Sequence, residues 1–281
     1  MVFENIVSKI IQSTLGEYSQ CINGLENLNM SYWSGKVLLK NLTVKNELAT
    51  KLKLPFDILF SNIGKLEATI PWNQLSSQPI TVHLSDIYLV ISPKTTENPE
   101  DFDIDPFQIK QDTIEKYFKR ILSNIDELKK INSESDKSWT GTLISKIMNN
   151  LTFSIKNIHI RMEVKHDLFK TPFSYGFTLA ELSIFTTNSY GLQIFNKEPS
   201  ESEPMYKKIE LKNAAVYWNH HDHSFGPFAS KESTINRMKN TVFCENNLKN
   251  EYLTGFSYLV HFDMDIMVTH RIRTKEIVLA N

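Results

Sequence analysis

The residues best suited to metal binding lie together in the segment Asn219-His220-His221-Asp222-His223. In an extended segment alternate side chains point to the same side, so His221 and His223 could act as a pair. A zinc site needs three or four ligands in tetrahedral geometry, and this segment offers two on one side. We therefore interpret it as a solvated loop and predict neither a metal site nor a cofactor.

The sequence also lacks the motifs of common enzymes. It contains no glycine-rich phosphate loop, nucleophile elbow, HExxH or CxxC motif. Its 9 glycines are not clustered, and its acidic and histidine residues are scattered, so no catalytic pair stands out. The two cysteines, Cys21 and Cys244, could form one disulfide at most, which favours reduced thiols in the cytosol. The chain is predicted not to be an enzyme.

Composition argues against several further classes of protein. The formal net charge of -1 over 281 residues disfavours nucleic-acid binding, which usually requires a basic stripe. No run reaches the roughly 20 apolar residues that a membrane-spanning helix needs. Residues 1–15 are apolar but include Glu4 and Lys9, so a secretory signal is not expected. The hydrophobic fraction of 41% favours a globular protein with a sizeable core.

A short repeat phrase occurs five times along the chain. It consists of two alternating apolar residues, then a polar residue, then two more alternating apolar residues. Alternation predicts a β-strand, and its repetition predicts a sheet built from similar units. The copies span residues 37–44, 82–89, 153–160, 177–184 and 209–216, with Asn41, Asp86, Asn157, Glu181 and Asn213 at the polar position.

The apolar positions change parity at the polar residue of each copy. In the third copy Phe153 and Ile155 are odd-numbered, whereas Ile158 and Ile160 are even-numbered. A regular strand would send the two halves to opposite faces, whereas a β-bulge would keep them on one face and bend the strand. We favour the bulge, because the intervening positions stay polar. A true change of face is the alternative.

The remaining elements follow from periodicity and from proline. An amphipathic helix is predicted at 2–18, a helical turn at 45–54, and two further helices at about 106–131 and 139–148. An acidic loop at 94–106 and hydrophilic loops at 196–204 and 219–255 separate the other elements. Strands beyond the first repeat phrase are expected at 66–72, 79–91, 151–165, 173–187, 205–219 and 256–270.

The pattern thus predicts seven strands that each have an apolar face, but only three amphipathic helices that could cover those faces. A sheet can pack on itself, as sandwiches and half-barrels do, and the pattern alone favours such a closed core. The alternative that the pattern leaves open is an apolar groove that binds a ligand.

Several short motifs have a characteristic order and spacing. They are Trp33-Ser34-Gly35, Leu52-x-Leu54-Pro55-Phe56, Ile63-Gly64-Lys65-Leu66, Ile70-Pro71-Trp72, Leu75, Pro79 and Ile87-Tyr88-Leu89. With the N-terminal helix, they resemble the N-terminal chorein domain of the bridge-like lipid-transfer proteins. The vacuolar protein sorting type is the better match, and the autophagy-related type is a weaker one. The similarity continues into residues 173–187 and 211–219, so it covers nearly the whole chain.

The resemblance implies an α+β, mostly β fold. The expected architecture is a curved antiparallel sheet that forms a scoop or half-tube, capped by the N-terminal helix and two or three further helices. The chain is then a single domain over 1–281, with a chorein core at 1–93, an acidic loop and helices at 94–150, and further groove strands at 151–281. Because residues 275–281 read as the middle of a strand, we expect a fragment of a much longer chain.

The resemblance also implies that the concave apolar face binds the acyl chains of glycerophospholipids as cargo. The repeat phrases and the last predicted strand supply the residues that are expected to line this face. These residues are Leu66, Ala68, Ile70, Val82, Leu84, Leu89, Phe153, Ile155, Ile158, Ile160, Phe177, Leu179, Leu182, Ile184, Ile209, Leu211, Val216, Val260, Phe262 and Met264.

The function implied by the resemblance is phospholipid transport between organelle membranes at contact sites, with this end at the endoplasmic reticulum. The chain would be a cytoplasmic, peripheral membrane protein with phospholipids, a membrane surface and membrane proteins such as scramblases as partners. The helix residues expected next to the membrane are Phe3, Ile6, Val7, Ile10 and Ile11.

One departure from the family pattern and one alternative function remain. The family often has glycine two residues before its Ile-Gly motif, where this chain has Ser61, so the local turn there is expected to differ. The alternative function is that of an adaptor, a self-packed β-rich module that docks a protein partner through its N-terminal helix.

Overall fold

One sheet dominates the part of the chain that the structure describes. A computed structural model describes residues 16–25, 29–31, 35–71, 74, 78–94, 150–165, 171–195, 204–220, 230–243 and 257–270. Within these residues nine strands form a single sheet with the order β1-β3-β4-β5-β6-β7-β8-β9, and β2 also pairs with β3. The strands are β1 (Ile22–Asn23), β2 (Asn29–Ser31), β3 (Lys36–Val44), β4 (Phe56–Thr69), β5 (Ile80–Pro93), β6 (Leu151–Val164), β7 (Phe173–Thr187), β8 (Met205–His220) and β9 (Tyr258–His270).

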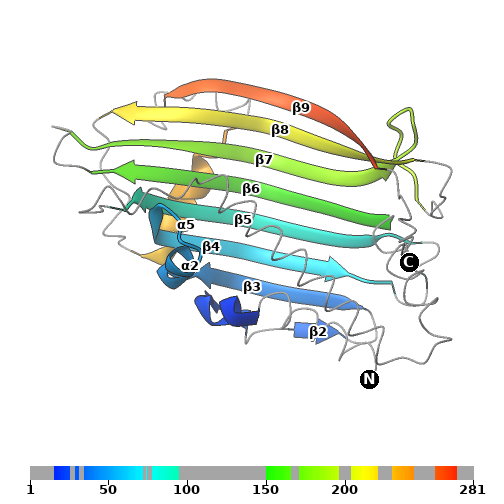
Figure 1. Cartoon of the computed structure of the whole chain (residues 1–281), viewed down its shortest axis with the longest axis horizontal. Helices are drawn as coiled ribbons and strands as arrows, with labels where there is room; N and C mark the ends of the chain where they lie inside the picture. The colour runs from blue at the N-terminus through cyan, green and yellow to red at the C-terminus, as the bar shows by residue number, and fades with distance from the viewer. Residues whose placement is uncertain are drawn as a thin grey trace, which may run out of the picture.

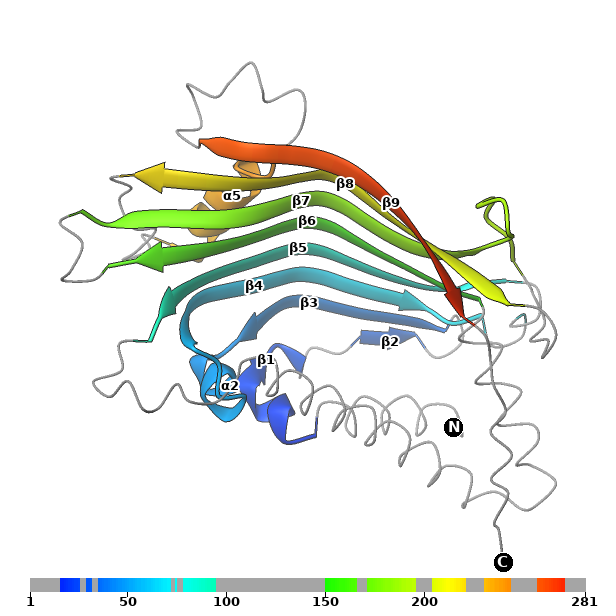
Figure 2. The same ribbon diagram turned by 45° about the horizontal axis from the view of Figure 1, so that its top comes forward.

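The sheet is bent into an arch. Neighbouring strands are antiparallel except β5 and β6, which run parallel. Figure 1 shows the long strands side by side, and Figure 2 shows that they curve together, with α5 (Lys231–Asn240) against the outer side and α2 (Asn46–Lys51) below the inner side. We call the two sides of the sheet the inner face and the outer face. The predicted mostly β, curved sheet is therefore confirmed.

Strand positions agree well with the sequence pattern, with one exception. β5, β6, β7, β8 and β9 lie within two residues of the predicted ranges. The strand expected at 66–72 instead begins at Phe56 and ends at Thr69. The departure from the family pattern at Ser61 put the local turn there in doubt, and the structure has no turn at this point, because Ser61 lies within β4 and pairs with Leu89 of β5.

The helical turn before Pro55 is confirmed as α2, but α5 was not predicted. The segment 219–255 was expected to be a hydrophilic loop, and it contains this helix of 10 residues. Ser230 is the N-cap, and its hydroxyl accepts a hydrogen bond of 3.0 Å from the backbone N–H of Ser233. The helix covers a buried cluster on the outer face that consists of Tyr88, Val90, Tyr217, Met238 and Val242.

The bend coincides with residues in the left-handed backbone region. Asn41, Asp86, Asn157 and Asn213 have φ values of 56°, 57°, 56° and 53°. Each occupies the polar position of a repeat phrase in the middle of its strand. Asparagine and aspartate adopt this conformation more readily than most residues, which explains their use here. The predicted bending at these four positions is confirmed.

The extra residues oppose one another from strand to strand. Lys40 pairs with Lys65 and Leu42 with Ile63, so Asn41 faces Gly64 without a change in register. The same holds for each pair from β3 to β8, and the row of extra residues is Asn41, Gly64, Asp86, Asn157, Ala180 and Asn213. We call this the crease. The prediction of Glu181 for β7 is wrong, because Glu181 pairs normally with Lys156 and Lys212, and Ala180 takes the crease position.

Several sequence predictions lie outside the described residues. These are residues 2–15 of the predicted helix at 2–18, with Phe3, Ile6, Val7, Ile10 and Ile11, both helices between 106 and 148, and His221 to His223. The end of the predicted helix is described, and it belongs to a 3-10 helix, η1 (Gly16–Cys21). Within the described ranges, no group of three or more potential metal ligands occurs. Over those same ranges, the structure has no helix with the length and apolar character that crossing a membrane requires.

Candidate functional site

The inner face carries apolar residues in rows that run across the strands. In each strand the residues before and after the crease alternate, and cross-strand pairing aligns them with those of the neighbouring strand. The four inner rows are Val37-Ala68-Val82-Phe153-Ile184-Ile209-Ile266, Leu39-Leu66-Leu84-Ile155-Leu182-Leu211-Met264, Leu42-Ile63-Ile87-Ile158-Leu179-Ala214-Phe262 and Ser61-Leu89-Ile160-Phe177-Val216-Val260.

Nineteen of the twenty residues predicted to line the groove belong to these rows. The exception is Ile70, which follows the end of β4 and donates its backbone N–H to the carbonyl of Gly35 at 2.8 Å. The prediction omitted Val37, Leu39, Leu42, Ile63, Ile87, Ala214 and Ile266, which complete the rows together with Ser61. The same alternation could have identified the residues of β3, because its repeat phrase was already visible.

The crease explains how apolar residues of both parities share the inner face. Asp86 points to the outer side, where its Oδ1 accepts hydrogen bonds from Tyr88 Oη at 3.0 Å and from Asn157 Nδ2 at 2.9 Å. Ser85 precedes it in the polar outer row of Lys65, Lys156 and Lys212, so two consecutive side chains point outward. A β-bulge adds a residue to one strand only, whereas here neighbouring strands each carry one, so the predicted bulge is replaced by a bend that these strands share and that returns Ile87 to the inner face.

The crease also requires one glycine. A Cβ atom on Gly64 would lie 2.8 Å from the Cβ of Asp86, closer than such atoms approach in proteins. The position therefore has room for a glycine only, although the backbone of Gly64 is not among those with positive φ. This requirement explains the Ile63-Gly64 motif by packing.

The rows are only partly covered by other parts of the described chain. Most inner-row residues of β5 to β8 have intermediate exposure, although Leu179 is 3% exposed and Ala214 is fully buried. At the edge strand β9, Val260 is 49% and Met264 40% exposed. Val37, Leu39 and Leu42 of β3 are buried, so the exposed part of the rows spans β4 to β9. An apolar surface of this extent is unusual on a soluble monomer and typical of a binding surface.

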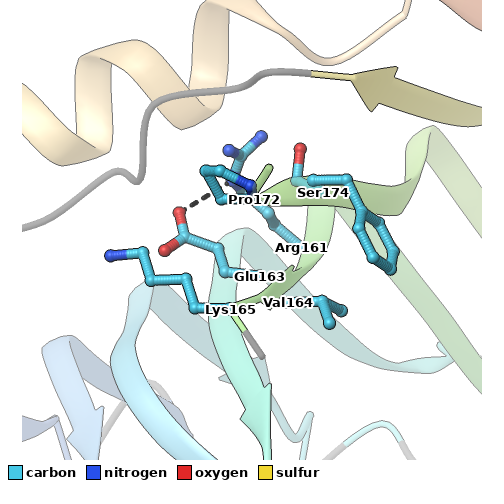
Figure 3. A pocket seen from close by; sticks show the side chains of 7 residues that line it. Arg161, Glu163, Val164, Lys165, Pro172 and Ser174 are labelled. Carbon is cyan, nitrogen blue, oxygen red and sulfur yellow. Dashed lines mark hydrogen bonds and ion pairs between the residues drawn. The ribbon is translucent and has the colours of Figure 1, made fainter. Parts of the chain in front are cut away.

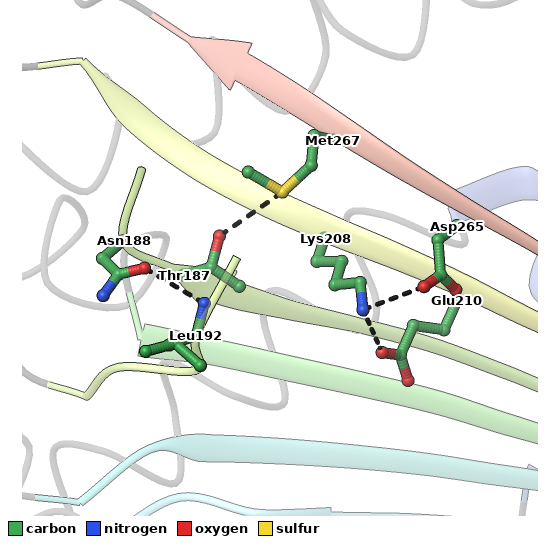
Figure 4. Close-up of polar contacts among 7 residues, drawn as sticks. All are labelled: Thr187, Asn188, Leu192, Lys208, Glu210, Asp265 and Met267. Atoms are coloured by element: carbon green, nitrogen blue, oxygen red, sulfur yellow. Dashed lines mark hydrogen bonds and ion pairs between the residues drawn. The ribbon is translucent and has the colours of Figure 1, made fainter. Parts of the chain in front are cut away.

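The outer face is polar on one side of the crease. Its rows alternate with the inner ones, and one of them reads Glu67-His83-Ser154-Ser183-Glu210-Asp265. The amine of Lys208 lies between Glu210 at 2.7 Å and Asp265 at 3.0 Å, as Figure 4 shows. Hydrogen bonds to these two carboxylates raise the pKa of Lys208. This part of the outer face is suited to contact with water.

On the other side of the crease α5 and the turn after it cover the outer face. His159 is fully buried there, and its Nε2 lies 2.9 Å from Tyr217 Oη. Its Nδ1 lies 2.9 Å from the carbonyl of Met238 and 2.8 Å from Thr241 Oγ1. Burial is the main cause that lowers the pKa of His159 to about 4. The neutral imidazole therefore fastens α5 to the sheet.

A small recess lies at the end of β6 on the same side. Figure 3 shows Arg161, Glu163, Pro172 and Ser174 around it. Arg161 Nε lies 3.0 Å from Glu163 Oε1, and both side chains are nearly buried. The recess has no enclosed space that a water-sized molecule could fill, so we do not regard it as a ligand site.

The inner face has two rims, one at each end of the strands, and the side chains at the two rims differ in chemistry. Aromatic rings gather at one rim, where Phe173 and Trp218 stack with centroids 4.7 Å apart and Tyr175 and Trp218 at 5.7 Å. At the opposite rim Lys207 Nζ donates hydrogen bonds to Thr186 Oγ1 at 2.7 Å and to the carbonyl of Leu151 at 3.3 Å. The apolar rows thus lie between an aromatic rim and a rim that carries an amine.

Comparisons with known proteins point to one family. The sequence pattern of the VPS13-like family N-terminal region matches residues 2–253. The chain is 28% identical over 259 residues to intermembrane lipid transfer protein VPS13A of Mus musculus, covering 90% of this chain and 8% of the mouse protein. It is 30% identical over 226 residues to intermembrane lipid transfer protein vps13A of Dictyostelium discoideum, covering 78% of this chain and 7% of that protein.

A third relative agrees with these two. The chain is 29% identical over 229 residues to intermembrane lipid transfer protein VPS13 of Chaetomium thermophilum, covering 80% of this chain and 7% of the fungal protein. The chain therefore spans less than a tenth of the length of these curated relatives. The relatives are named for lipid transfer, a non-enzymatic activity, in agreement with the prediction that this chain is not an enzyme.

Proposed function

Because this chain belongs to the VPS13-like family, we propose that its inner face binds the acyl chains of glycerophospholipids and forms part of a path for them between two membranes. The family match confirms the resemblance noted from the motifs between Trp33 and Leu89. The observation that supports the proposal most directly is the set of four inner rows, which continue across the strands without a charged residue.

The free energies involved explain why such a surface would serve transport. Burying one methylene group is worth about 0.8 kcal/mol, so a phospholipid with roughly 30 methylenes faces on the order of 20 kcal/mol on leaving a bilayer for water. An apolar surface removes most of this penalty. Because its contacts are weak, alike and non-directional, a lipid can move from row to row without a deep energy minimum.

The finer features of the proposal concern the membranes at either end. We infer that the protein acts at contacts between organelles as a cytoplasmic, peripheral membrane protein, with the endoplasmic reticulum at this end. Membrane proteins such as scramblases would exchange lipid with it. The names of the relatives support transfer between membranes, since each is an intermembrane lipid transfer protein.

Lipid loading of the purified chain tests the proposal. We expect glycerophospholipid to copurify in at least stoichiometric amount when the protein is analysed by lipid mass spectrometry. A triple variant with Ile155→Asp, Leu182→Asp and Leu211→Asp places three carboxylates side by side in one inner row, and it should lose bound lipid.

A matched control lies on the outer face of the same strands. Ser154 and Ser183 are neighbours in the polar outer row, so Ser154→Asp with Ser183→Asp adds charge without touching the inner face. This variant should load lipid like the parent protein. Absence of lipid from the parent protein would refute the proposal, whereas unfolding of the inner variant alone would favour the alternative of a self-packed adaptor.

A further inference from the structure

Two consecutive lysines point to opposite faces of β8. Lys207 has the same parity as Ile209 and Leu211, and no crease residue separates them, so Lys207 lies on the inner face. Lys208 lies on the outer face with Glu210 and Asp265. Lys208 therefore has the environment expected of a surface lysine, whereas Lys207 is an amine at the border of an apolar surface.

The Lys207 side chain lies across β7 toward β6. Its backbone pairs with Thr186, whose hydroxyl accepts a hydrogen bond from Nζ at 2.7 Å, and Nζ also reaches the carbonyl of Leu151 at 3.3 Å. Thr186 is 4% exposed, so the amine is held by a buried hydroxyl group and a main-chain oxygen. Desolvation in this position lowers the pKa of Lys207 to about 8.

The distance between this amine and the apolar rows suits one molecule. Lys207 lies two residue positions from Ile209 and pairs with Thr186, so it lies about 7 Å along the strands from the first inner row of Ile209, Ile184 and Phe153. In a phospholipid the phosphate lies just beyond the glycerol to which the acyl chains are attached. A lipid with its tails on the inner rows could therefore place its phosphate at Lys207.

The chemistry of the contact also favours phosphate. An ammonium group forms its strongest hydrogen bonds with anionic oxygens, and such bonds strengthen where water is partly excluded. The opposite rim carries the rings of Phe173, Tyr175 and Trp218, whose faces do not attract an anion, and the imidazole of His220, which packs against Trp218. The two rims would thus orient a lipid with its head toward Lys207.

We propose that Lys207, supported by Thr186, is a contact site for the phosphate of a phospholipid whose acyl chains lie on the inner rows. This inference rests on the proposed function, because it needs a lipid on the inner face. It adds a preference for lipids that carry a phosphate over lipids with the same tails and none.

Competitive loading tests the inference. The purified chain is incubated with equal amounts of dioleoyl phosphatidylcholine and dioleoylglycerol, and the bound lipids are quantified by mass spectrometry. We expect the parent protein to favour the phospholipid by about tenfold, the effect of one hydrogen bond to a charged group. Lys207→Met should reduce this ratio to nearly one while total bound lipid stays the same, and Lys207→Arg should restore it.

Lys208→Met is the matched control, since it removes the same charge one residue away on the outer face. It should keep the ratio of the parent protein. An unchanged ratio in Lys207→Met, with normal loading, would overturn the inference and leave the proposed function intact. A parent protein that loads neither lipid would overturn both.

One further arm distinguishes a lipid phosphate from a free anion. Glycerol phosphate has the head chemistry without the tails, so it should not displace bound phosphatidylcholine at equal concentration. Displacement by this compound would show a general anion site and would overturn the assignment to a lipid.

Discussion

Asn157 donates a hydrogen bond of 2.9 Å from Nδ2 to Oδ1 of Asp86, and both residues have left-handed backbone conformation. They lie 71 positions apart in sequence, on the two strands of the sheet that run parallel. The bond links the crease residues of β5 and β6, and because these two strands are parallel, no hairpin can set their alignment. The crease is thus held by side chains as well as by backbone conformation.

Substitutions of Asn157 should separate these two contributions. Asn157→Gly removes the hydrogen bond but suits the backbone, so we expect a loss of about 1 kcal/mol in the free energy of unfolding. Asn157→Ala also forces an alanine into the left-handed region and should lose about 2–3 kcal/mol. Urea unfolding provides the comparison. Equal losses in the two variants would show that backbone conformation at the crease contributes little.

Acid should weaken the attachment of α5 through His159. Burial lowers the pKa of His159 from 6.5 to about 4, a Met238 hydrogen bond opposes this shift, and the charge of Arg161 adds to it. Because the folded protein binds the proton less tightly than the unfolded chain, stability is fully present above about pH 6.5 and is lost as the pH falls toward 4.

The loss through His159 should amount to about 3 kcal/mol over this pH range. Urea unfolding between pH 8 and pH 4.5 measures it. His159→Gln should flatten the dependence, whereas His83→Gln, at an exposed histidine on the outer face, should not. An identical pH profile for His159→Gln and the parent protein would show that protonation of His159 does not cause the loss of stability in acid.

Gly176 should not tolerate a side chain. An added Cβ would lie 2.5 Å from the carbonyl oxygen of Ile160 and 2.5 Å from Tyr217 Oη. Gly176→Ala must therefore displace the tyrosine that binds His159, and we expect a loss of about 1–3 kcal/mol in thermal or urea unfolding. The same substitution in a Tyr217→Leu background should cost less, since one of the two clashes is gone. Equal costs in both backgrounds would place the strain in the backbone of Ile160 alone.

Ser61 should stabilise the end of β3. Its hydroxyl accepts a hydrogen bond from the backbone N–H of Val44 at 2.6 Å and donates one to the carbonyl of Val44 at 2.8 Å. Ser61→Gly loses both bonds and adds backbone freedom, so we expect a loss of about 1–2 kcal/mol. Hydrogen exchange offers a local readout, because the Val44 amide should exchange faster. Unchanged protection of that amide would refute this role.

Much of the sheet could be predicted because alternation is strong in its long strands. The strands from β5 to β9 each carry apolar residues at regular spacing, and the change of parity at Asp86 and Asn157 correctly indicated a bend. The repeat phrase did not identify the crease in β4 and β7, because Gly64 and Ala180 occupy it there and neither is polar. Their backbones satisfy the geometry without the polar side chain by which the repeat phrase was defined.

The elements that were missed depend on tertiary contacts. The α5 segment has little apolar character apart from Ile235 and Met238, so no wide hydrophobic stripe marks it as a helix. It is stabilised by burial of Met238 against Tyr217 and Val90 of the sheet. The alternation places Lys207 on the same face as Ile209 and Leu211. Its contact with Thr186 depends on the pairing of β7 with β8, which the sequence pattern does not give.

The crease limits how the sequence can change over evolution. A substitution at Asn157 alters one conformation, but deleting that residue would shift one half of β6 by a single position. Ser154 would then replace Ile155 on the inner face, and every neighbour in that half would change sides. Apart from Gly64, residue types along the crease can therefore change at moderate cost, whereas the number of residues in each strand is constrained. Single-residue insertions and deletions should be tolerated in the loops at the rims and rejected at the crease.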